Sequence, residues 1–222
     1  MTPPRQEEFA SLKEFLMAHR TPVKMKQIPR TAKPKLVLKF KPLRMAQWKD
    51  LEKLFGERGA CGGCWCMWAR LKRADFARQK GARNKAAFKE VVAGGPAPGV
   101  LVYKGAEAIG WCAVAPREVY LRLEKSRVLA RVDEKPVWSI TCLFVAKPFR
   151  RSGVSVGLLK AAAEYAAKHG AKLVEGYPIE PGSEAMPDAF AWTGLASAFG
   201  TAGFKEVARR SKTRPIMRRV MK

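Results

Sequence analysis

The stretch Val137-Trp-Ser-Ile-Thr-Cys-Leu-Phe-Val-Ala-Lys-Pro-Phe-Arg-Arg-Ser-Gly-Val-Ser-Val-Gly-Leu-Leu-Lys160 carries the strongest structural signal of this chain. Residues 137–145 are mostly apolar or β-branched, which predicts a buried strand. A basic, glycine-containing turn follows at 150–155, and the Ala/Leu-rich residues 155–168 predict a helix. The first N–H groups of a helix are unpaired and the helix dipole is positive there, so this turn is suited to bind a diphosphate. We therefore expect the segment to hold a phosphate-bearing ligand.

The turn has the pattern R-x-x-G-x-S, which is short enough to occur by chance. The chain contains neither the G-x-x-x-x-G-K-[ST] pattern of a P-loop nor the G-x-G-x-x-G pattern of a dinucleotide-binding fold. The order of the elements around the turn must therefore indicate which ligand binds there.

The rest of the chain predicts further strands and helices. Two β-type runs flank Lys104-Gly-Ala-Glu107 and predict a hairpin. In chain order we expect a strand at 36–40, helices at 45–58 and 83–92, strands at 100–103 and 108–114, an irregular helix at 118–129, a strand at 137–145, helix 155–168, strand 172–177, helix 194–201, and strands at 204–208 and 215–220. This order predicts an α/β protein with a mixed, mostly antiparallel sheet flanked by helices.

This element order around the turn resembles the GNAT superfamily of acyl-CoA-dependent N-acyltransferases over about residues 36–210. The resemblance implies that the backbone of Leu143, Phe144 and Val145 pairs with the pantetheine arm of acetyl-CoA. It also implies that the diphosphate is wrapped by Arg150, Arg151, Ser152, Gly153, Val154 and Ser155. The chain would then be an N-acetyltransferase in which a bound primary amine attacks the thioester directly, in a ternary complex. The acceptor does not follow from the sequence.

Two positions depart from the pattern of that family. The family commonly carries a tyrosine that protonates the coenzyme thiolate, and Phe199 stands at its place. An asparagine often found shortly before it is replaced by Trp192. Strand alternation puts Glu175 and Tyr177 on one face of the strand at 172–177, so we expect these two as base and acid. The alternative for Glu175 is a carboxylate paired with one of the many lysines.

The segment Cys61-Gly-Gly-Cys-Trp-Cys-Met-Trp68 is the least ordinary part of the sequence. Its C-x-x-C-x-C spacing offers Cys61, Cys64 and Cys66 to a zinc ion, but the second cysteine pair of a complete structural zinc site is missing. A redox-active or nucleophilic thiol is a second interpretation. The third is packing around the acceptor cleft, because buried cysteine behaves as a small apolar residue.

In a GNAT-like chain this segment lies between the first two helices, which cover the acceptor site. We therefore expect Trp65, Met67 and Trp68 to line the substrate pocket. An indole there would offer a cation–π surface to an amine.

The net charge of +24 is concentrated at the two ends of the chain, with +8 over residues 1–50 and +7 over residues 205–222. Such ends attract polyanions through counterion release. A different class of function is therefore open as well. The chain could be a nucleic-acid- or ribosome-binding protein whose GNAT-like core binds acyl-CoA without catalysis.

Residues 1–34 predict a basic N-terminal extension, made of a short amphipathic helix at 6–18 and a proline-containing linker. A GNAT-like acetyltransferase domain follows at 35–222. No run of eighteen apolar residues exists, and Glu7, Glu8 and Lys13 interrupt any signal-peptide block. We expect a cytoplasmic protein without a membrane span, with reduced cysteines, that could form a homodimer.

Overall fold

The computed structural model describes residues 37–182 and 188–222, so the predicted extension at 1–34, with its helix at 6–18, lies outside the described residues. The strands within the described ranges are β1 (Leu38–Pro42), β2 (Gly99–Lys104), β3 (Glu107–Pro116), β4 (Trp138–Val145), β5 (Leu173–Gly176), β6 (Lys205–Arg209) and β7 (Pro215–Val220). They form one sheet in the order β1-β2-β3-β4-β5-β7-β6. Neighbouring strands are antiparallel except β4 and β5, which are parallel. The predicted mixed, mostly antiparallel sheet is confirmed.

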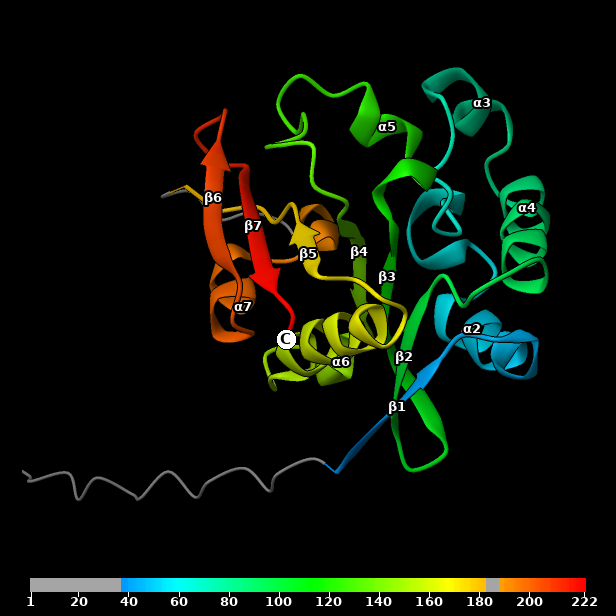
Figure 1. The fold of residues 1–222 in the computed structure, drawn as a ribbon. Coiled ribbons are helices and arrows are strands. Elements are labelled where there is room, and N and C mark those ends of the chain that lie inside the picture. Colours follow the sequence, from blue (N-terminus) through cyan, green and yellow to red (C-terminus); the bar gives the residue numbers. More distant parts are fainter. Residues whose placement is uncertain (1–36, 183–187) are drawn as a thin grey trace, which may run out of the picture. The chain divides into compact units, whose positions relative to one another are not determined.

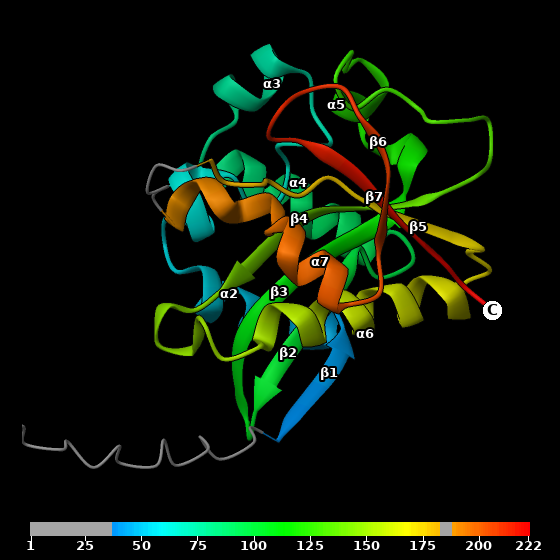
Figure 2. The ribbon, with the colours of Figure 1, turned by 90° about the vertical axis from the view of Figure 1, so that its left-hand side faces the viewer.

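Helices cover both faces of this sheet. The helices and helical turns are η1 (Met45–Gln47), α2 (Trp48–Phe55), η2 (Gly59–Gly63), α3 (Arg73–Arg78), α4 (Ala82–Ala93), η3 (Arg117–Val119), α5 (Leu121–Glu124), η4 (Lys147–Phe149), α6 (Val154–Lys168), η5 (Asp188–Thr193) and α7 (Ala196–Thr201). Helices α6 and α7 enclose one core with Leu158 and Phe199, and α2 and α4 enclose another with Leu51 and Trp111. Figure 1 shows α2, α3 and α4 grouped beside β2–β4, away from β6 and β7. Figure 2 shows α7 in front of the strands and α4 behind them.

Most predicted elements are confirmed, with ends that differ by a few residues. The helix predicted at 45–58 ends earlier, at Phe55, because Gly56 has a φ of 66° and caps it. At 118–129 only η3 and the short α5 are helical. Helix α3 was not expected, since none of its side chains is buried and the sequence there has no apolar periodicity. Among the described residues, no helix is long and apolar enough to cross a membrane.

The pairing of β4 changes partway along the strand. Against β3, the register shifts between Ala113 and Val114, which leaves Thr141 as the extra residue of a β-bulge. Against β5, pairing ends at Ile140 and Gly176. A bulge bends its strand and increases the local twist, so β4 continues past β5 without pairing with it.

Gly99 begins β2 at a point where β3 approaches closely. A Cβ at Gly99 would lie 2.2 Å from the carbonyl oxygen of Cys112 and 2.5 Å from the ring of Trp111. Neither neighbour can move easily, because Cys112 is part of the β2–β3 ladder and Trp111 is fully buried. The pairing of these two strands therefore requires glycine at this position.

We predict that Gly99→Ala lowers the free energy of unfolding by about 1–3 kcal/mol, as overpacking of a core does. Gly95→Ala is the matched control in the same connection, because nothing lies within 4 Å of a Cβ there. Urea unfolding followed by tryptophan fluorescence measures both variants. Equal midpoints and slopes for the two variants would contradict the prediction.

Candidate functional site

Beyond the bulge, β4 has a partner strand on one side only among the described residues. The N–H of Ala146 donates to β3 at 2.9 Å. Successive strand residues turn their backbone groups to alternate edges, so Val145 and Leu143 direct theirs to the open edge and Phe144 directs its own to β3. The Nε of Arg150 donates to the carbonyl of Val145 at 3.0 Å. The open half of β4 is thus tied to the turn that follows it.

The turn between β4 and α6 presents its backbone to solvent. Arg151 and Gly153 have φ values of 58° and 81°, in the left-handed region. Gly153 is the N-cap of α6, and Val154 is buried while the turn before it is exposed. The hydroxyl of Ser152 donates to the carbonyl of Phe149 at 2.6 Å. The first N–H groups of α6 have no partner within the helix, so the residues predicted to wrap a diphosphate do meet at a helix N-terminus.

A cavity of about 270 Å³ lies beside the open half of β4. The cysteine segment lines it with Cys61, Cys64, Cys66 and Trp68. Strand β4 lines it with Thr141, Cys142, Leu143 and Phe144, and Phe76, Lys80 and Trp192 also contribute. The cysteine segment therefore forms a wall of the space into which the open half of β4 faces.

Trp65 and Met67 do not lie on this wall. They are 1% and 4% exposed and belong to the core beneath α2. The ring centroid of Trp65 lies 6.3 Å from that of Trp48 and 5.7 Å from that of Phe55. The expectation that both residues line the substrate pocket is therefore corrected, because their large apolar side chains are buried against α2. Of the three side chains expected there, Trp68 is on the cavity wall.

The three cysteines of the segment point to different partners. Cys61 is exposed. The thiol of Cys64 donates to the carbonyl of Gly59 at 3.2 Å, and the sulfur of Cys66 accepts from Nε1 of Trp111 at 2.9 Å. Within residues 37–182 and 188–222, no three His, Cys, Asp or Glu side chains are placed to hold a metal ion. The zinc site considered for Cys61, Cys64 and Cys66 is not formed there.

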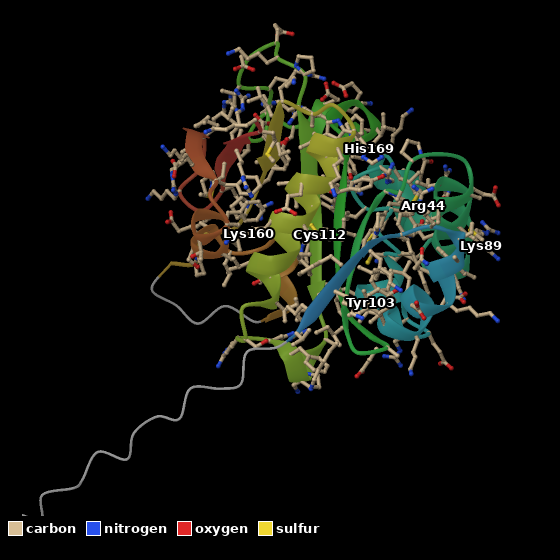
Figure 3. The ribbon with its side chains drawn as sticks, turned by 60° about the horizontal axis from the view of Figure 1, so that its bottom comes forward. Arg44, Lys89, Tyr103, Cys112, Lys160 and His169 are labelled. Atoms are coloured by element: carbon tan, nitrogen blue, oxygen red, sulfur yellow. The ribbon has the colours of Figure 1, made fainter. Side chains whose placement is uncertain are left out.

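Burial also makes the thiols of Cys64 and Cys66 poor nucleophiles. Desolvation raises the pKa of Cys64 to about 11 and raises that of Cys66 well above its ordinary value. Burial likewise raises the pKa of Cys112, which lies in the interior (Figure 3). Since the thiolate is the reactive and metal-binding form, packing is the role that the structure supports for Cys64 and Cys66.

Glu175 and Tyr177 lie together at the end of β5, 1% and 2% exposed. The hydroxyl of Tyr177 donates to Oε2 of Glu175 at 3.0 Å, and Oε1 accepts two bonds from Arg218, at 2.6 and 2.9 Å. Arg117 donates to the oxygen of Tyr177 at 2.7 Å, and Ser139 lies 2.8 Å from the same oxygen. The expected shared face is confirmed, and the partners of Glu175 are arginines instead of lysines.

The same arginines hold the connection between β3 and β4. Arg117 pairs with Glu124 at 2.8 Å, and Arg218 pairs with Asp133 at 2.8 Å. Burial and the charge of Glu175 raise the pKa of Tyr177, so its hydroxyl stays protonated at neutral pH. The network fixes the end of β5, where it parts from β4, while the catalytic roles of Glu175 and Tyr177 stay predictions.

Phe199 lies where β4 and β5 separate. A Cβ on Gly176 would lie 1.9 Å from its ring and a Cβ on Gly194 would lie 2.8 Å from it, so the two glycines make room for the ring. Phe204 packs against the same ring with centroids 5.0 Å apart. The ring of Phe199 therefore packs against the last residue of β5, and it has no hydroxyl with which to donate a proton.

Sequence reasoning missed several residues of the cavity wall, among them Trp192, Thr141 and Cys142. Trp192 packs edge-on against Trp68 with centroids 4.6 Å apart, so the residue at the expected asparagine position joins the wall. Thr141 and Cys142 face the cavity because the bulge shifts the alternation of β4. A bulge leaves no pattern in a single apolar run, so the sequence held no signal for these two.

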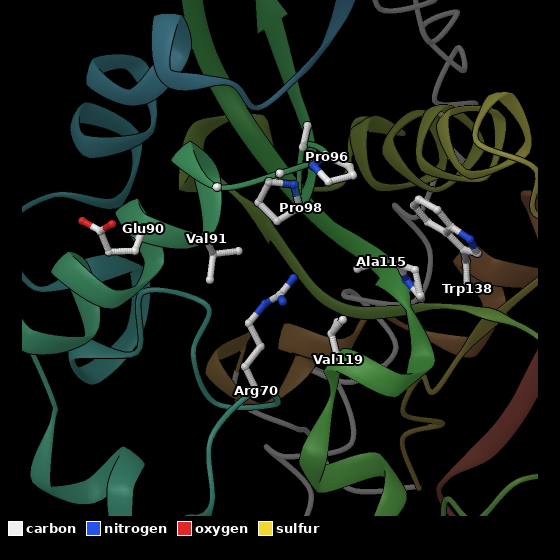
Figure 4. A pocket seen from close by; sticks show the side chains of 12 residues that line it. Arg70, Glu90, Val91, Pro96, Pro98, Ala115, Val119 and Trp138 are labelled. Carbon is white, nitrogen blue, oxygen red and sulfur yellow. The ribbon is translucent and has the colours of Figure 1, made fainter.

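A second cavity, of about 490 Å³, lies near the first residue of β4 and the last residues of β3. Figure 4 shows the guanidinium of Arg70 directed into it between Pro98 and Val119, and the carboxylate of Glu90 directed away. The guanidinium carbon of Arg70 lies 4.9 Å from the ring centroid of Tyr120. Because Trp138 and not the open half of β4 lines this cavity, it is distinct from the site beside the bulge.

The profile described as the Acetyltransferase (GNAT) family matches residues 65–182, which is more than half of the chain. A crystal structure of a GNAT-family acetyltransferase from Streptococcus agalactiae is 10% identical, with 83% of this chain and 96% of that chain covered and a TM-score of 0.51. One from Listeria monocytogenes is 7% identical, with 83% and 95% covered and a TM-score of 0.51. No curated protein matches the sequence. The two structures share the fold with this chain.

We predict that Cys64 reacts with iodoacetamide at pH 8 at least about 100-fold more slowly than exposed Cys61. A pKa of about 11 leaves roughly one Cys64 thiol in 1,000 ionised at that pH. Peptide mass spectrometry over time measures both rates, and Cys112 serves as the fully buried control. Labelling of Cys64 as fast as Cys61 would contradict the packing role.

Proposed function

Because the chain belongs to the acetyltransferase (GNAT) family, we propose that it is an N-acetyltransferase with acetyl-CoA as donor and a primary amine as acceptor. The observation that carries this proposal is the open half of β4, which leads directly into the exposed turn at the start of α6. An open strand edge can pair with the amides of an extended ligand, and a helix N-terminus binds phosphate. An acyl-CoA carries its pantetheine amides and its diphosphate one after the other, so it can use both features at once.

The turn fits a diphosphate in shape and charge. Nothing lies within 4 Å of the place where a Cβ of Gly153 would be, so an anion can approach its backbone. Arg151 and Lys147 are exposed beside it. On β4, the backbone groups of Leu143 and Val145 are the ones that can pair with the pantetheine arm. Phe144, which was also expected to pair with it, directs its backbone groups to β3 instead.

Acetyl-CoA supplies the acetyl group as a thioester. On the cavity wall, the partly buried Cys64 and the buried Cys66 are held protonated, which supports direct transfer to the amine in a ternary complex. Glu175 and Tyr177 stay the candidates for proton transfer. The two arginines on Glu175 favour a role in holding β5 over a role as general base.

We predict that Gly153→Asp raises the dissociation constant for acetyl-CoA by about 100-fold, because a carboxylate would face the diphosphate at the helix N-terminus. Isothermal titration calorimetry measures the constant.

Gly170→Asp at the other end of α6 is the matched control. Gly170 also has a positive φ, 87°, with nothing within 4 Å of a Cβ, so the backbone strain is similar while the added carboxylate lies far from the turn. Equal affinities of the two variants would contradict the assignment of the turn, and no binding to the unaltered protein would contradict the proposed donor.

A further inference from the structure

The cavity beside β4 has a wall rich in aromatic rings and thiols and poor in charge. Among the described residues that line it, Lys80 alone carries a charge, and none is acidic. Lys80 is exposed, so it lies at the rim. The rings of the wall belong to Trp68, Phe76, Phe144 and Trp192. An amine that enters therefore meets an apolar surface with a positive edge.

Two of the four rings of this wall, those of Trp68 and Phe76, already have a cation of the protein over them. The guanidinium carbon of Arg122 lies 4.5 Å from the ring centroid of Trp68 and 5.5 Å from that of Phe76. Its Nε donates to the carbonyl of Leu71 at 3.2 Å, which holds it in place. Burial lowers the pKa of Arg122, and so does the nearby charge of Arg73. A substrate ammonium at these rings would meet a positive charge, which corrects the expected cation–π role of the indole.

Carboxylates on neighbouring elements are neutralised by the protein's own arginines. Asp75, on the same helix as Phe76, pairs with Arg78. Glu175, on the strand next to β4, is bound by Arg218 at 2.6 Å and lies 3.9 Å from Arg117. Among the residues whose side chains the structure describes, these contacts leave little negative charge to stabilise an ammonium in the cavity.

The charge of the wall selects among amines. A primary alkylamine with the pKa of lysine is uncharged in about one molecule in 2,500 at pH 7. Burial and nearby positive charge both disfavour its ammonium form, and a polyamine would bring several such groups. An amine attached to an aromatic ring is uncharged at pH 7, because its lone pair is delocalised, and its ring can pack against aromatic and sulfur-containing side chains.

We propose that the acceptor is a small aromatic monoamine, which enters this cavity uncharged. The inference rests on the proposed acetyltransferase function and names the acceptor class for the same site. An apolar cavity of about 150 Å³ is large enough to bind benzene, so a cavity of about 270 Å³ suits a single substituted ring.

The transfer balances without an added reagent. The nitrogen lone pair forms an N–C bond to the acetyl carbonyl carbon, and the C–S bond of the thioester breaks. The proton lost by nitrogen ends on the coenzyme A thiolate, so the products are an N-aryl acetamide and free coenzyme A. Because the amine arrives without an ammonium proton, no carboxylate has to remove one first, in keeping with the arginine contacts of Glu175.

The test is coenzyme A release from acetyl-CoA at pH 7 with 4-methoxyaniline, spermidine or kanamycin as acceptor. We expect kcat/KM for 4-methoxyaniline to exceed that for either polycation by at least about 100-fold. A higher or equal value for a polycation, or no turnover of the aromatic amine, would overturn the inference. Calorimetry of acetyl-CoA binding in the same samples separates failure of the proposed function from failure of the proposed acceptor class. Absence of acetyl-CoA binding counts against the proposed function. Binding of acetyl-CoA together with a preference for a polycation counts only against the acceptor class.

Two pairs of variants locate the effect in this cavity. Trp68→Ala should raise KM for 4-methoxyaniline about 10-fold with unchanged acetyl-CoA affinity, because a ring contact is lost. Trp138→Ala is the control, since Trp138 is also half-buried and lines the other cavity.

Lys80→Glu should raise kcat/KM for spermidine about 10-fold, because a carboxylate would replace an ammonium at the rim of the cavity and attract the polycation. Lys89→Glu, on the outer side of α4 (Figure 3), makes the same change away from the cavity. Equal responses within either pair would overturn the inference.

Discussion

The end of pairing between β4 and β5 at Ile140 and Gly176 is the constraint on which the site depends. The bulge at Thr141 bends β4, and the ring of Phe199 lies against Gly176, where any side chain would collide with it. Beyond that point β4 runs on to Val145 with an edge that no described strand covers, where the carbonyl of Val145 accepts from Arg150 and the remaining backbone groups are open to water or a ligand. Helix α6 begins just after this edge, so an acyl-CoA can meet a strand edge and a helix N-terminus in sequence.

The cysteine segment that lines the cavity beside β4 is held in place at a cost in backbone strain. Ala60, Trp65 and Cys66 have positive φ values of 62°, 41° and 56°, and such residues cost of order 1–3 kcal/mol each. The buried Asn84 offsets part of this cost by donating to the carbonyl of Gly63 at 3.1 Å. Burial of Trp65 beneath α2 offsets more. The result is a wall of thiols and rings held against the open half of β4.

Much of the fold could be predicted from the sequence, because the strands and helices carry local periodicity and the diphosphate turn is continuous in the chain. The parts that could not be predicted depend on long-range contacts. The arginines that bind Glu175 and Tyr177 come from positions 117 and 218, and no local pattern marks them among so many basic residues. Trp65 and Trp68 are three residues apart, yet the positive φ values between them send one to the core and the other to the cavity.

In the proposed function, the open half of β4 and the turn before α6 together hold the acyl donor. A crystal structure of the full chain soaked with acetyl-CoA tests it most directly. The pantetheine amides should hydrogen-bond to the backbone of Leu143 and Val145, with the diphosphate at residues 151–155 and the thioester facing the 270 Å³ cavity. Density for the donor in the 490 Å³ cavity around Arg70, with the edge of β4 unliganded, would contradict it.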